Sequence, residues 1–333
     1  MKNVIYGLAS TQLLHEEAEF IKKADPFGII LFTRNIESKE QVQQLITELK
    51  DTLSRDINIF IDQEGGRVAR LKAPMFRKLP AAKFFADLYA KDSIAAINAS
   101  FLNHYLIGLE LKTFLINGCF APVADLYYDY THQVIGDRSF GNAVEQATKL
   151  AQAAHDGLIK AGVMACIKHL PGHGRATVDS HLELPRVTAS IAELEATDFK
   201  VFKELKANFA MTAHIIYDAL DPEHPATTSK QSIEYIKNNL FNGIIVSDDI
   251  GMKALQGDFK TITKQVIDAG VDIVLHCSGN LEEMKQIDEA AIELESQISQ
   301  ALTVEADNNL DYQTALNQYT KIIEPFLSEI HYA

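Results

Sequence analysis

The sequence is poor in cysteine and has no long hydrophobic segment. Its 333 residues include three cysteines, which are far apart and form no C-x-x-C pair: Cys119, Cys166 and Cys277. We therefore expect reduced, buried thiols in a cytoplasmic protein, and no zinc site built from cysteines. No apolar run approaches the length of about 18 residues that a membrane span requires. The first apolar run, residues 4–8, is also too short for a secretory signal.

Positive charge is scarce as well. The chain has 31 Lys and Arg residues against 45 Asp and Glu residues, so its formal net charge is −14. Binding to nucleic acids or to anionic membranes relies on clustered Lys and Arg, and we expect neither kind of partner. Because no linker or shift in composition divides the chain, we predict a single domain over residues 1–333. We also expect the protein to be a monomer.

Short apolar runs alternate with longer amphipathic segments along the whole chain. There are eight such runs, at residues 4–8, 28–32, 57–61, 118–121, 163–167, 209–213, 243–246 and 271–275. Runs of this length suit strands that are buried on both faces, as in a parallel sheet. The alternation predicts an α/β fold, specifically a (β/α)8 TIM-type barrel with a helical extension after about Glu305. The rival is an open doubly wound sheet, but its usual G-x-G-x-x-G loop is absent after the first run.

A capping pattern marks the start of several helices. Ser or Asn is followed three residues later by Glu or Gln at Ser38, Asn142, Ser190 and Asn280. The helix after Asn280 is expected to reach about Leu302. Gly162 and Gly270 stand where C-terminal helix glycines belong. The long stretch of residues 62–117, between the third and fourth runs, must contain extra structure.

Polar side chains follow these runs directly, where a barrel of this kind has its active site. The third run is followed by Asp62-Gln-Glu-Gly-Gly-Arg-Val-Ala-Arg70, and the seventh by Ser247-Asp248-Asp249. After the fifth run comes Lys168-His169-Leu-Pro-Gly-His-Gly, then four residues, then Asp179-Ser-His181. Titratable groups on a Gly/Pro loop at a strand end are typical of a catalytic loop.

Most of these groups also have a purely structural interpretation. Asp62 and Arg70 suit hydrogen bonds to sugar hydroxyls, or else a salt bridge that orders their own loop. The adjacent pair Asp137–Arg138 has the same two interpretations. Successive strand residues point to opposite faces, so only one of Asp248 and Asp249 is expected in the site, as nucleophile, general base or metal ligand. The other would cap the following helix.

The spacing of Asp179 and His181 favours proton transfer. Side chains two residues apart in an extended loop point the same way, and a carboxylate beside an imidazole fixes its tautomer and raises its pKa. Such an imidazole suits a proton donor near neutrality. The alternative is a zinc site, but barrel metallohydrolases usually need a His-x-His near the first strand, which is absent. Its ligands would be His169, His173, His181 and His214.

Together these motifs resemble the β-N-acetylhexosaminidases of glycoside hydrolase family 3. The signature is Lys168-His-x-Pro-Gly-His-Gly-x4-Asp-Ser-His181. Other segments match in order: the Asp62 to Arg70 motif, Gly136-Asp-Arg-Ser-Phe-Gly141, Met211-Thr-Ala-His214 and Ser247-Asp-Asp249. The members most resembled are cytoplasmic bacterial enzymes of cell-wall recycling, which remove N-acetylglucosamine from anhydro-N-acetylmuramoyl peptides. Departures at Leu170 and Gly251 leave substrate preference slightly open.

The resemblance implies a retaining exo-β-N-acetylglucosaminidase that needs neither a cofactor nor a metal. Asp248 would be the nucleophile, and His181, oriented by Asp179, would be the acid/base. Gly172 and Gly174 would let the loop swing His181 in and out. The substrate is then a small carbohydrate, an N-acetylglucosaminyl muropeptide. Its sugar would be held by Asp62, Arg70, Arg138, Lys168 and His169.

Three other functions stay open at this point. A phosphorylase would use the same site with phosphate in place of water, because a neutral histidine as acid/base admits an anionic acceptor. A zinc-dependent hydrolase would lose its activity to a chelator. A non-catalytic sugar-binding protein would show no turnover, an interpretation against which Asp179, His181 and Asp248 argue.

Overall fold

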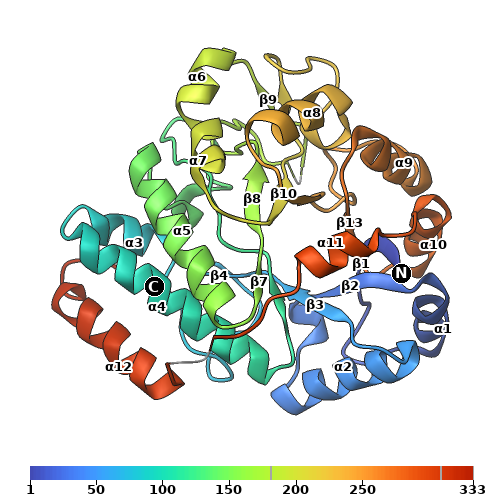
Figure 1. The fold of residues 1–333 in the computed structure, drawn as a ribbon, viewed down its shortest axis with the longest axis horizontal. Coiled ribbons are helices and arrows are strands. Elements are labelled where there is room, and N and C mark those ends of the chain that lie inside the picture. Colours follow the sequence, from blue (N-terminus) through green and yellow to red (C-terminus); the bar gives the residue numbers. More distant parts are fainter. Residues whose placement is uncertain (181, 308–309, 333) are drawn as a thin grey trace.

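Parallel strands occupy the centre of the protein and helices surround them (Figure 1). The computed structural model describes residues 1–180, 182–307 and 310–332. The larger sheet has six strands, in the order β13 Val274–His276, β1 Lys2–Gly7, β2 Pro26–Leu31, β3 Asn58–Ile61, β6 Gly118–Cys119 and β7 Met164–Ala165. The smaller sheet has three, in the order β12 Ile244–Val246, β10 Phe209–Thr212 and β8 Ile167–Leu170.

All eight apolar runs of the sequence contain a strand, which confirms the predicted α/β class. The strands do not form one continuous ladder, because the fifth run is divided at Cys166 into β7 and β8, which belong to different sheets. Two isolated parallel bridges link the sheets, one between Val123 and Lys168 and one between Val246 and Ile273. At both junctions the strand contact is therefore reduced to a single residue pair.

An apolar cluster lies among the strands and draws side chains from both sheets. Phe60 and Phe120 stack in it with ring centroids 5.0 Å apart. A Cβ at Gly118 would lie 2.3 Å from the Phe60 ring, so only glycine leaves room for this packing. The remaining members include Ile5, Ile30, Cys166, Phe209, Met211, Val246 and Leu275. Since these side chains are buried, the space between the strands is a packed core and not a channel.

The helices turn an apolar face toward the strands. In α2 (Lys39–Leu53) the buried side chains are spaced three or four residues apart, at Val42, Leu45, Ile46 and Leu49. The predicted caps at Ser38, Ser190 and Asn280 all accept hydrogen bonds from backbone amides. The other surrounding helices are α1 His15–Ala24, α4 Ser93–Thr113, α5 Val144–Lys160, α6 Ile191–Ala196, α7 Asp198–Glu204, α8 Lys230–Asn239, α9 Phe259–Ala269 and α10 Leu281–Ala290.

Two predicted helix ends are wrong. The N-cap of α5 is Ala143 and not Asn142, because the helix begins at Val144, one residue later than the capping pattern implied. The helix after Asn280 ends at Ala290, because the chain then pairs with the N-terminal strand: the backbone amide of Asn3 donates to the carbonyl of Ile292 at 2.9 Å. A separate short helix, α11 (Ser296–Ala301), follows.

Residues 62–117 contain extra structure, as predicted. β4 (Gln63–Gly65) and β5 (Val68–Ala69) form a small antiparallel hairpin, followed by α3 (Ala82–Tyr89) and then α4. The buried Gln63 side chain holds this hairpin, because its Oε1 accepts from the amides of Arg70 and Leu71 at 2.9 and 3.1 Å. A Cβ at Gly65 would lie 2.2 Å from the carbonyl oxygen of Pro80, so the turn requires glycine.

The C-terminal extension is helical, also as predicted. Its main element, α12 (Tyr312–Ile323), packs beside α4 (Figure 1). A two-stranded parallel sheet of β9 (Arg186–Val187) and β11 (Ile216–Tyr217) lies apart from the central strands. No helix in the described part of the chain has both the length and the apolar character to cross a membrane.

Candidate active site

A cavity of about 490 Å³ opens where the parallel strands end. It is lined by every predicted site residue that the structure describes: Asp62, Arg70, Arg138, Lys168, His169, Asp179 and Asp248. The remaining predicted residue, His181, lies outside the described residues. Residues in β8 and just after β3 and β12, far apart in sequence, thus meet at one edge because the strands run parallel.

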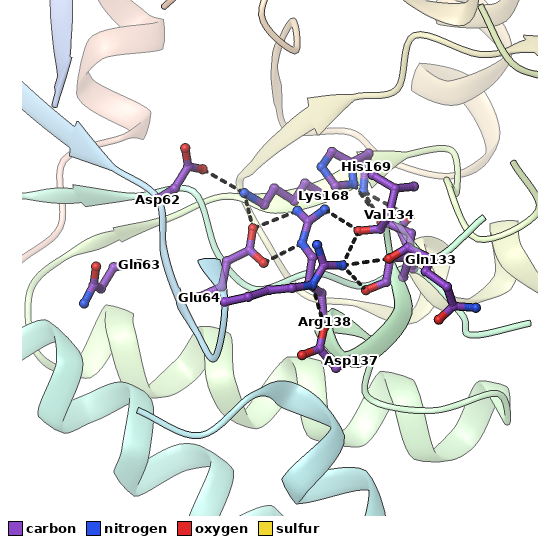
Figure 2. Close-up of polar contacts among 12 residues, drawn as sticks. Asp62, Gln63, Glu64, Gln133, Val134, Asp137, Arg138, Lys168 and His169 are labelled. Carbon is purple, nitrogen blue, oxygen red and sulfur yellow. Dashed lines mark hydrogen bonds and ion pairs between the residues drawn. The ribbon is translucent and has the colours of Figure 1, made fainter. Parts of the chain in front are cut away.

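A chain of ion pairs forms one wall of the cavity (Figure 2). Lys168 Nζ lies 2.9 Å from Asp62 Oδ1 and 2.7 Å from Glu64 Oε1. Asp62 also accepts a hydrogen bond from Arg70 Nη2 at 3.0 Å. Glu64 accepts two bonds from Arg138, both at 2.8 Å. Three cations therefore alternate with two carboxylates, and Lys168 bridges the two carboxylates.

Burial makes the charges of this wall interdependent. The Lys168 side chain is only 3% exposed and that of Glu64 only 7%. Burial alone would raise the pKa of Glu64, but Arg138 and Lys168 outweigh it and hold that pKa far below its usual range. Burial would likewise lower the pKa of Lys168, but Asp62 and Glu64 outweigh it and raise the pKa. These groups are therefore ionised at neutral pH.

Glu64 was missed by the sequence prediction. It stands two residues after Asp62, so period-two spacing in an extended segment could have placed both on one side. Of the two interpretations of Asp137–Arg138, the salt bridge between them is not formed, because Arg138 forms its fork with Glu64. Asp137 instead binds Arg67 Nε at 2.7 Å. An arginine binds a carboxylate best when two parallel N–H groups donate to its two oxygens. Arg138 binds Glu64 in this way and does not bind its sequence neighbour Asp137.

Replacing Glu64 with glutamine is expected to destabilise the fold by about 3 kcal/mol, because it leaves the buried Lys168 and Arg138 without their shared anion. The measurement is the free energy of unfolding from urea titrations. Glu193→Gln is the control, since Glu193 is half exposed in its pair with Arg175 and should cost less than about 1 kcal/mol. An equal loss of unfolding free energy in the two variants would show that the Glu64 charge stabilises the fold no more than an exposed charge does.

A further carboxylate, Asp125, holds His169 of β8 and His173, which follows that strand. It is 1% exposed and accepts from His169 Nδ1 at 2.7 Å and from the backbone amide of His173 at 2.6 Å. Burial would raise the pKa of Asp125, but His169 and the hydrogen bonds outweigh it and lower the pKa. His169 therefore donates through Nδ1, which leaves Nε2 as the ring nitrogen that a ligand can use. Asp125 is not among the predicted site residues.

The segment after Leu170 is closely packed. The Tyr217 hydroxyl donates to the carbonyl of Gly172 at 2.7 Å. A Cβ at Gly174 would lie 2.1 Å from the carbonyl oxygen of Leu126. Both glycines are buried and serve close packing in this structure, and their role as a hinge stays a prediction. Exposed residues begin only at Thr177.

Side chains also anchor the rest of this loop. Arg175 Nε donates to Asp198 in α7 at 2.6 Å, and its guanidinium carbon lies 4.7 Å from the centre of the Tyr128 ring. Further on, the buried Ser180 hydroxyl lies 3.0 Å from His173 Nε2. Asp179 follows Arg175 by four residues and lines the cavity directly before Ser180. The loop that carries Asp179 is thus attached at both ends.

The stability of the fold is expected to fall between pH 6.5 and pH 4, because several buried histidines stay neutral, including His214 and His276, whose pKa burial lowers. Burial lowers the pKa of His104 and of His173 to about 4, so the unfolded chain binds more protons between that value and 6.5. Stability is then complete above about pH 6.5 and decreases as the pH falls, by up to about 3 kcal/mol for each histidine.

Thermal unfolding midpoints measured across this pH range test the expectation. His104→Gln removes one of these titrating groups and should reduce the slope of stability against pH. An unchanged slope would contradict the role of His104.

Both adjacent aspartates after β12 line the cavity, contrary to the prediction that only one would. Asp248 Oδ1 accepts from the amide of Asp249 at 2.8 Å. Asp249 Oδ1 accepts from the amides of Gly251 and Cys277, at 3.0 and 3.1 Å. Asp249 therefore ties its own turn to the end of β13. It does not cap the following helix, because Asp258 caps α9.

The described candidate ligands of the alternative zinc site, His169, His173 and His214, are not grouped as a metal site. Among the described residues, no three His, Cys, Asp or Glu side chains are grouped in a way that could hold a metal ion. Both ring nitrogens of His214 are engaged, at 2.8 Å from Thr227 Oγ1 and 3.0 Å from the carbonyl of Asp249. The thiols are free, as predicted, but Cys277 is partly exposed and lines the cavity.

Known proteins with similar sequences share one activity. Residues 3–306 match the N-terminal domain of glycosyl hydrolase family 3. The β-hexosaminidase of Haemophilus ducreyi is 35% identical over 321 residues, covering 93% of this chain and 91% of its own. The β-hexosaminidase of Mannheimia succiniciproducens is 36% identical over 286 residues, covering 84% of this chain and 81% of its own.

Solved structures agree with the sequence relatives. Native NagZ from Neisseria gonorrhoeae superposes with a TM-score of 0.84 at 31% identity, covering 96% of this chain and 95% of its own. The complex of that protein with N-trifluoroacetyl-D-glucosamine gives a TM-score of 0.84 at 30% identity, covering 98% and 97%. The matched domain and these relatives span most of the chain, which therefore belongs to glycosyl hydrolase family 3 and is a β-N-acetylhexosaminidase.

Proposed function

We propose that the enzyme is a retaining exo-β-N-acetylglucosaminidase that removes terminal N-acetylglucosamine from anhydro-N-acetylmuramoyl peptides in the cytoplasm, as part of peptidoglycan recycling. The observation that carries this proposal is the meeting of Asp248 with the ion-paired wall of Asp62 and Lys168 in one cavity of about 490 Å³. That volume suits a single sugar ring with its N-acetyl group. The bound sugar analogue of the Neisseria relative supports the same substrate class.

Asp248 would act as the nucleophile. Its carboxylate attacks the anomeric carbon while the bond from that carbon to the leaving oxygen breaks, and the product is a covalent glycosyl-enzyme. His181, oriented by Asp179, gives its proton to the leaving oxygen. In the second step His181 takes a proton from water, the water oxygen bonds to the anomeric carbon, and Asp248 is released. Two inversions leave the configuration retained, and no cofactor or metal takes part.

The sugar would be held by the ion-paired wall. Asp62 can accept hydrogen bonds from hydroxyls, and Arg70 and Lys168 can donate to them. His169 would add a donor or acceptor at Nε2, because Asp125 occupies its Nδ1. Arg138 belongs to the same wall and would donate hydrogen bonds to the N-acetyl group or to the hydroxyls. Because these charges already bind one another, little reorganisation is needed when the sugar enters.

We also propose that the two parallel sheets are parts of one closed eight-stranded barrel in a single domain. The bridges Val123–Lys168 and Val246–Ile273 join the sheets at both ends of their strand order. The apolar cluster with side chains from both sheets supports this arrangement, because a barrel interior is filled in that way. In a barrel, Asp62, Lys168 and Asp248 lie at one mouth.

The test is to incubate the protein with an aryl N-acetylglucosaminide and an aryl glucoside, each with and without inorganic phosphate. We expect free N-acetylglucosamine from the first substrate only, at a rate that phosphate does not change. N-acetylglucosamine 1-phosphate as the main product would establish a phosphorylase. Loss of activity to a chelator, restored by zinc, would establish a metal hydrolase. Absence of turnover with every substrate would favour a non-catalytic sugar-binding protein.

The recycling role needs a natural substrate. A disaccharide of N-acetylglucosamine and anhydro-N-acetylmuramic acid with its peptide should be cleaved with a higher kcat/KM than a chitin disaccharide. The reverse preference would contradict the recycling role and leave the glycosidase activity intact.

A further inference from the structure

A closed set of buried hydrogen bonds lies directly behind Asp248. The backbone amide of Asp248 donates to Thr212 Oγ1 at 3.3 Å, and Thr212 Oγ1 lies 2.8 Å from Thr227 Oγ1. Thr227 Oγ1 in turn lies 2.8 Å from His214 Nδ1. His214 Nε2 lies 3.0 Å from the carbonyl oxygen of Asp249. The path therefore starts at the amide of the proposed nucleophile and returns to the chain one residue later.

The three side chains in this path are fully buried. Thr212, Thr227 and His214 each have 0% of their surface exposed. Thr212 ends β10, His214 follows it by two residues, and Thr227 lies in a short 3-10 helix, Ala226–Thr228. None of them lines the cavity. They therefore lie behind the site and are not placed to touch the sugar.

Elementary donor and acceptor rules assign a direction to every bond. A carbonyl oxygen only accepts, so His214 carries its proton on Nε2 and donates to Asp249. His214 Nδ1 must then accept, and the donor within reach is the Thr227 hydroxyl. That hydroxyl has one proton and thus accepts from Thr212. Thr212 has now donated its proton, and its lone pair accepts from the amide of Asp248.

This direction requires a neutral His214 ring. Burial lowers the pKa of His214 and outweighs the opposing effect of Asp248, so the ring is neutral near pH 7. Thr227 Oγ1 has a competing acceptor, the carbonyl of Ala213 at 3.1 Å. The shorter contact to His214 Nδ1, and the lack of any other donor to that nitrogen among the described residues, favour the closed arrangement.

We propose that Thr212, Thr227 and His214 are positioning residues that orient the peptide unit carrying Asp248 toward the anomeric carbon. The inference rests on the proposed role of Asp248 as the nucleophile. On the β10 side the strand pairing of β12 stops at Val246. On the β13 side the backbone amides of Ser247 and Ile250 still donate to the carbonyls of Ile273 and Leu275, at 2.9 and 3.0 Å. The buried path holds the next residues from behind. A displacement of the attacking oxygen by a fraction of an ångström is costly, because attack needs a close, aligned approach.

The experiment compares Thr227→Val with Thr227→Ser. Valine keeps the shape and removes the hydroxyl, whereas serine keeps the hydroxyl and removes a methyl group. The substrate is a dinitrophenyl N-acetylglucosaminide, whose leaving group needs no proton donor. We expect the rate of glycosyl-enzyme formation, measured in the first turnover, to fall about tenfold or more in Thr227→Val and to stay within about threefold of the parent in Thr227→Ser. The inhibition constant of N-acetylglucosamine should be unchanged in both.

Several outcomes would overturn the proposal. One is an equal rate loss in the valine and serine variants. Another is a loss of N-acetylglucosamine binding in proportion to the rate, which would indicate a general structural defect. If Thr227→Val does not fold, the pair Thr212→Val and Thr212→Ser makes the same comparison. A parent-like rate in Thr227→Val, with Asp248→Asn inactive, would reject the positioning role but keep the nucleophile. An active Asp248→Asn would reject the proposed function itself.

Discussion

Replacing Asp248 with asparagine is expected to reduce the turnover of aryl N-acetylglucosaminides by a factor on the order of 10⁴ to 10⁶, the loss typical of removing a nucleophile. The amide cannot form the covalent glycosyl-enzyme, and the remaining wall of Asp62 and Lys168 can only bind the sugar. The measurement is kcat with a dinitrophenyl glycoside, together with the inhibition constant of N-acetylglucosamine. Binding of this product should persist, because the wall is unchanged.

Asp249→Asn is the matched control for this substitution. The asparagine oxygen can still accept the amide bonds of Gly251 and Cys277, so we expect a much smaller loss. Sequence parity alone does not separate the two aspartates, and both line the cavity. If Asp249→Asn were the inactive variant and Asp248→Asn retained activity, the nucleophile assignment would be reversed. Thermal unfolding of both variants shows whether either loss comes from the fold.

Replacing His181 with alanine is expected to reduce turnover by a factor of about 10² to 10⁴ for substrates with poor leaving groups. Such substrates need a proton at the departing oxygen, whereas dinitrophenolate leaves without one. The measurement is the rate of glycosyl-enzyme formation across a series of aryl glycosides with leaving groups of different pKa. The loss should grow steadily as the leaving group becomes more basic.

Asp179→Asn should show the same trend with a smaller amplitude, because it weakens the orientation of the imidazole and leaves the proton donor present. Equal losses across the leaving-group series would count against an acid role for His181. Since His181 lies outside the described residues, this kinetic series is the direct test of its assignment.

The strands and the helix caps were predictable because they depend on local chemistry. Each apolar run contains a strand, and Ser38, Ser190 and Asn280 cap helices as their spacing predicts. The failures are also informative. The helix after Asn280 stops at Ala290 because the following residues pair with the N-terminus, which lies almost the full chain length away. Such a pairing has no local pattern.

The site was predictable in its residues but not in their partners. All of the predicted residues that the structure describes line one cavity. Glu64 and Asp125, which set the charge of Lys168 and the orientation of His169, were not among them. Both are carboxylates that follow strands. The sequence does not show whether such a carboxylate is paired with a buried cation or exposed to solvent, because that depends on which residues lie near it in space. The close packing around Gly172 and Gly174 likewise depends on residues remote in sequence.

The sequence by itself determined the family, the α/β class and the set of chemical groups at the site. These follow from motif chemistry, residue spacing and the position of polar residues after apolar runs, all of which are properties of a linear chain. Only the tertiary structure decided which carboxylate pairs with which cation, and that the buried path through Thr212, Thr227 and His214 ends at Asp248. The physical reason is that charge and hydrogen-bond energies depend on burial and on distances between residues remote in sequence.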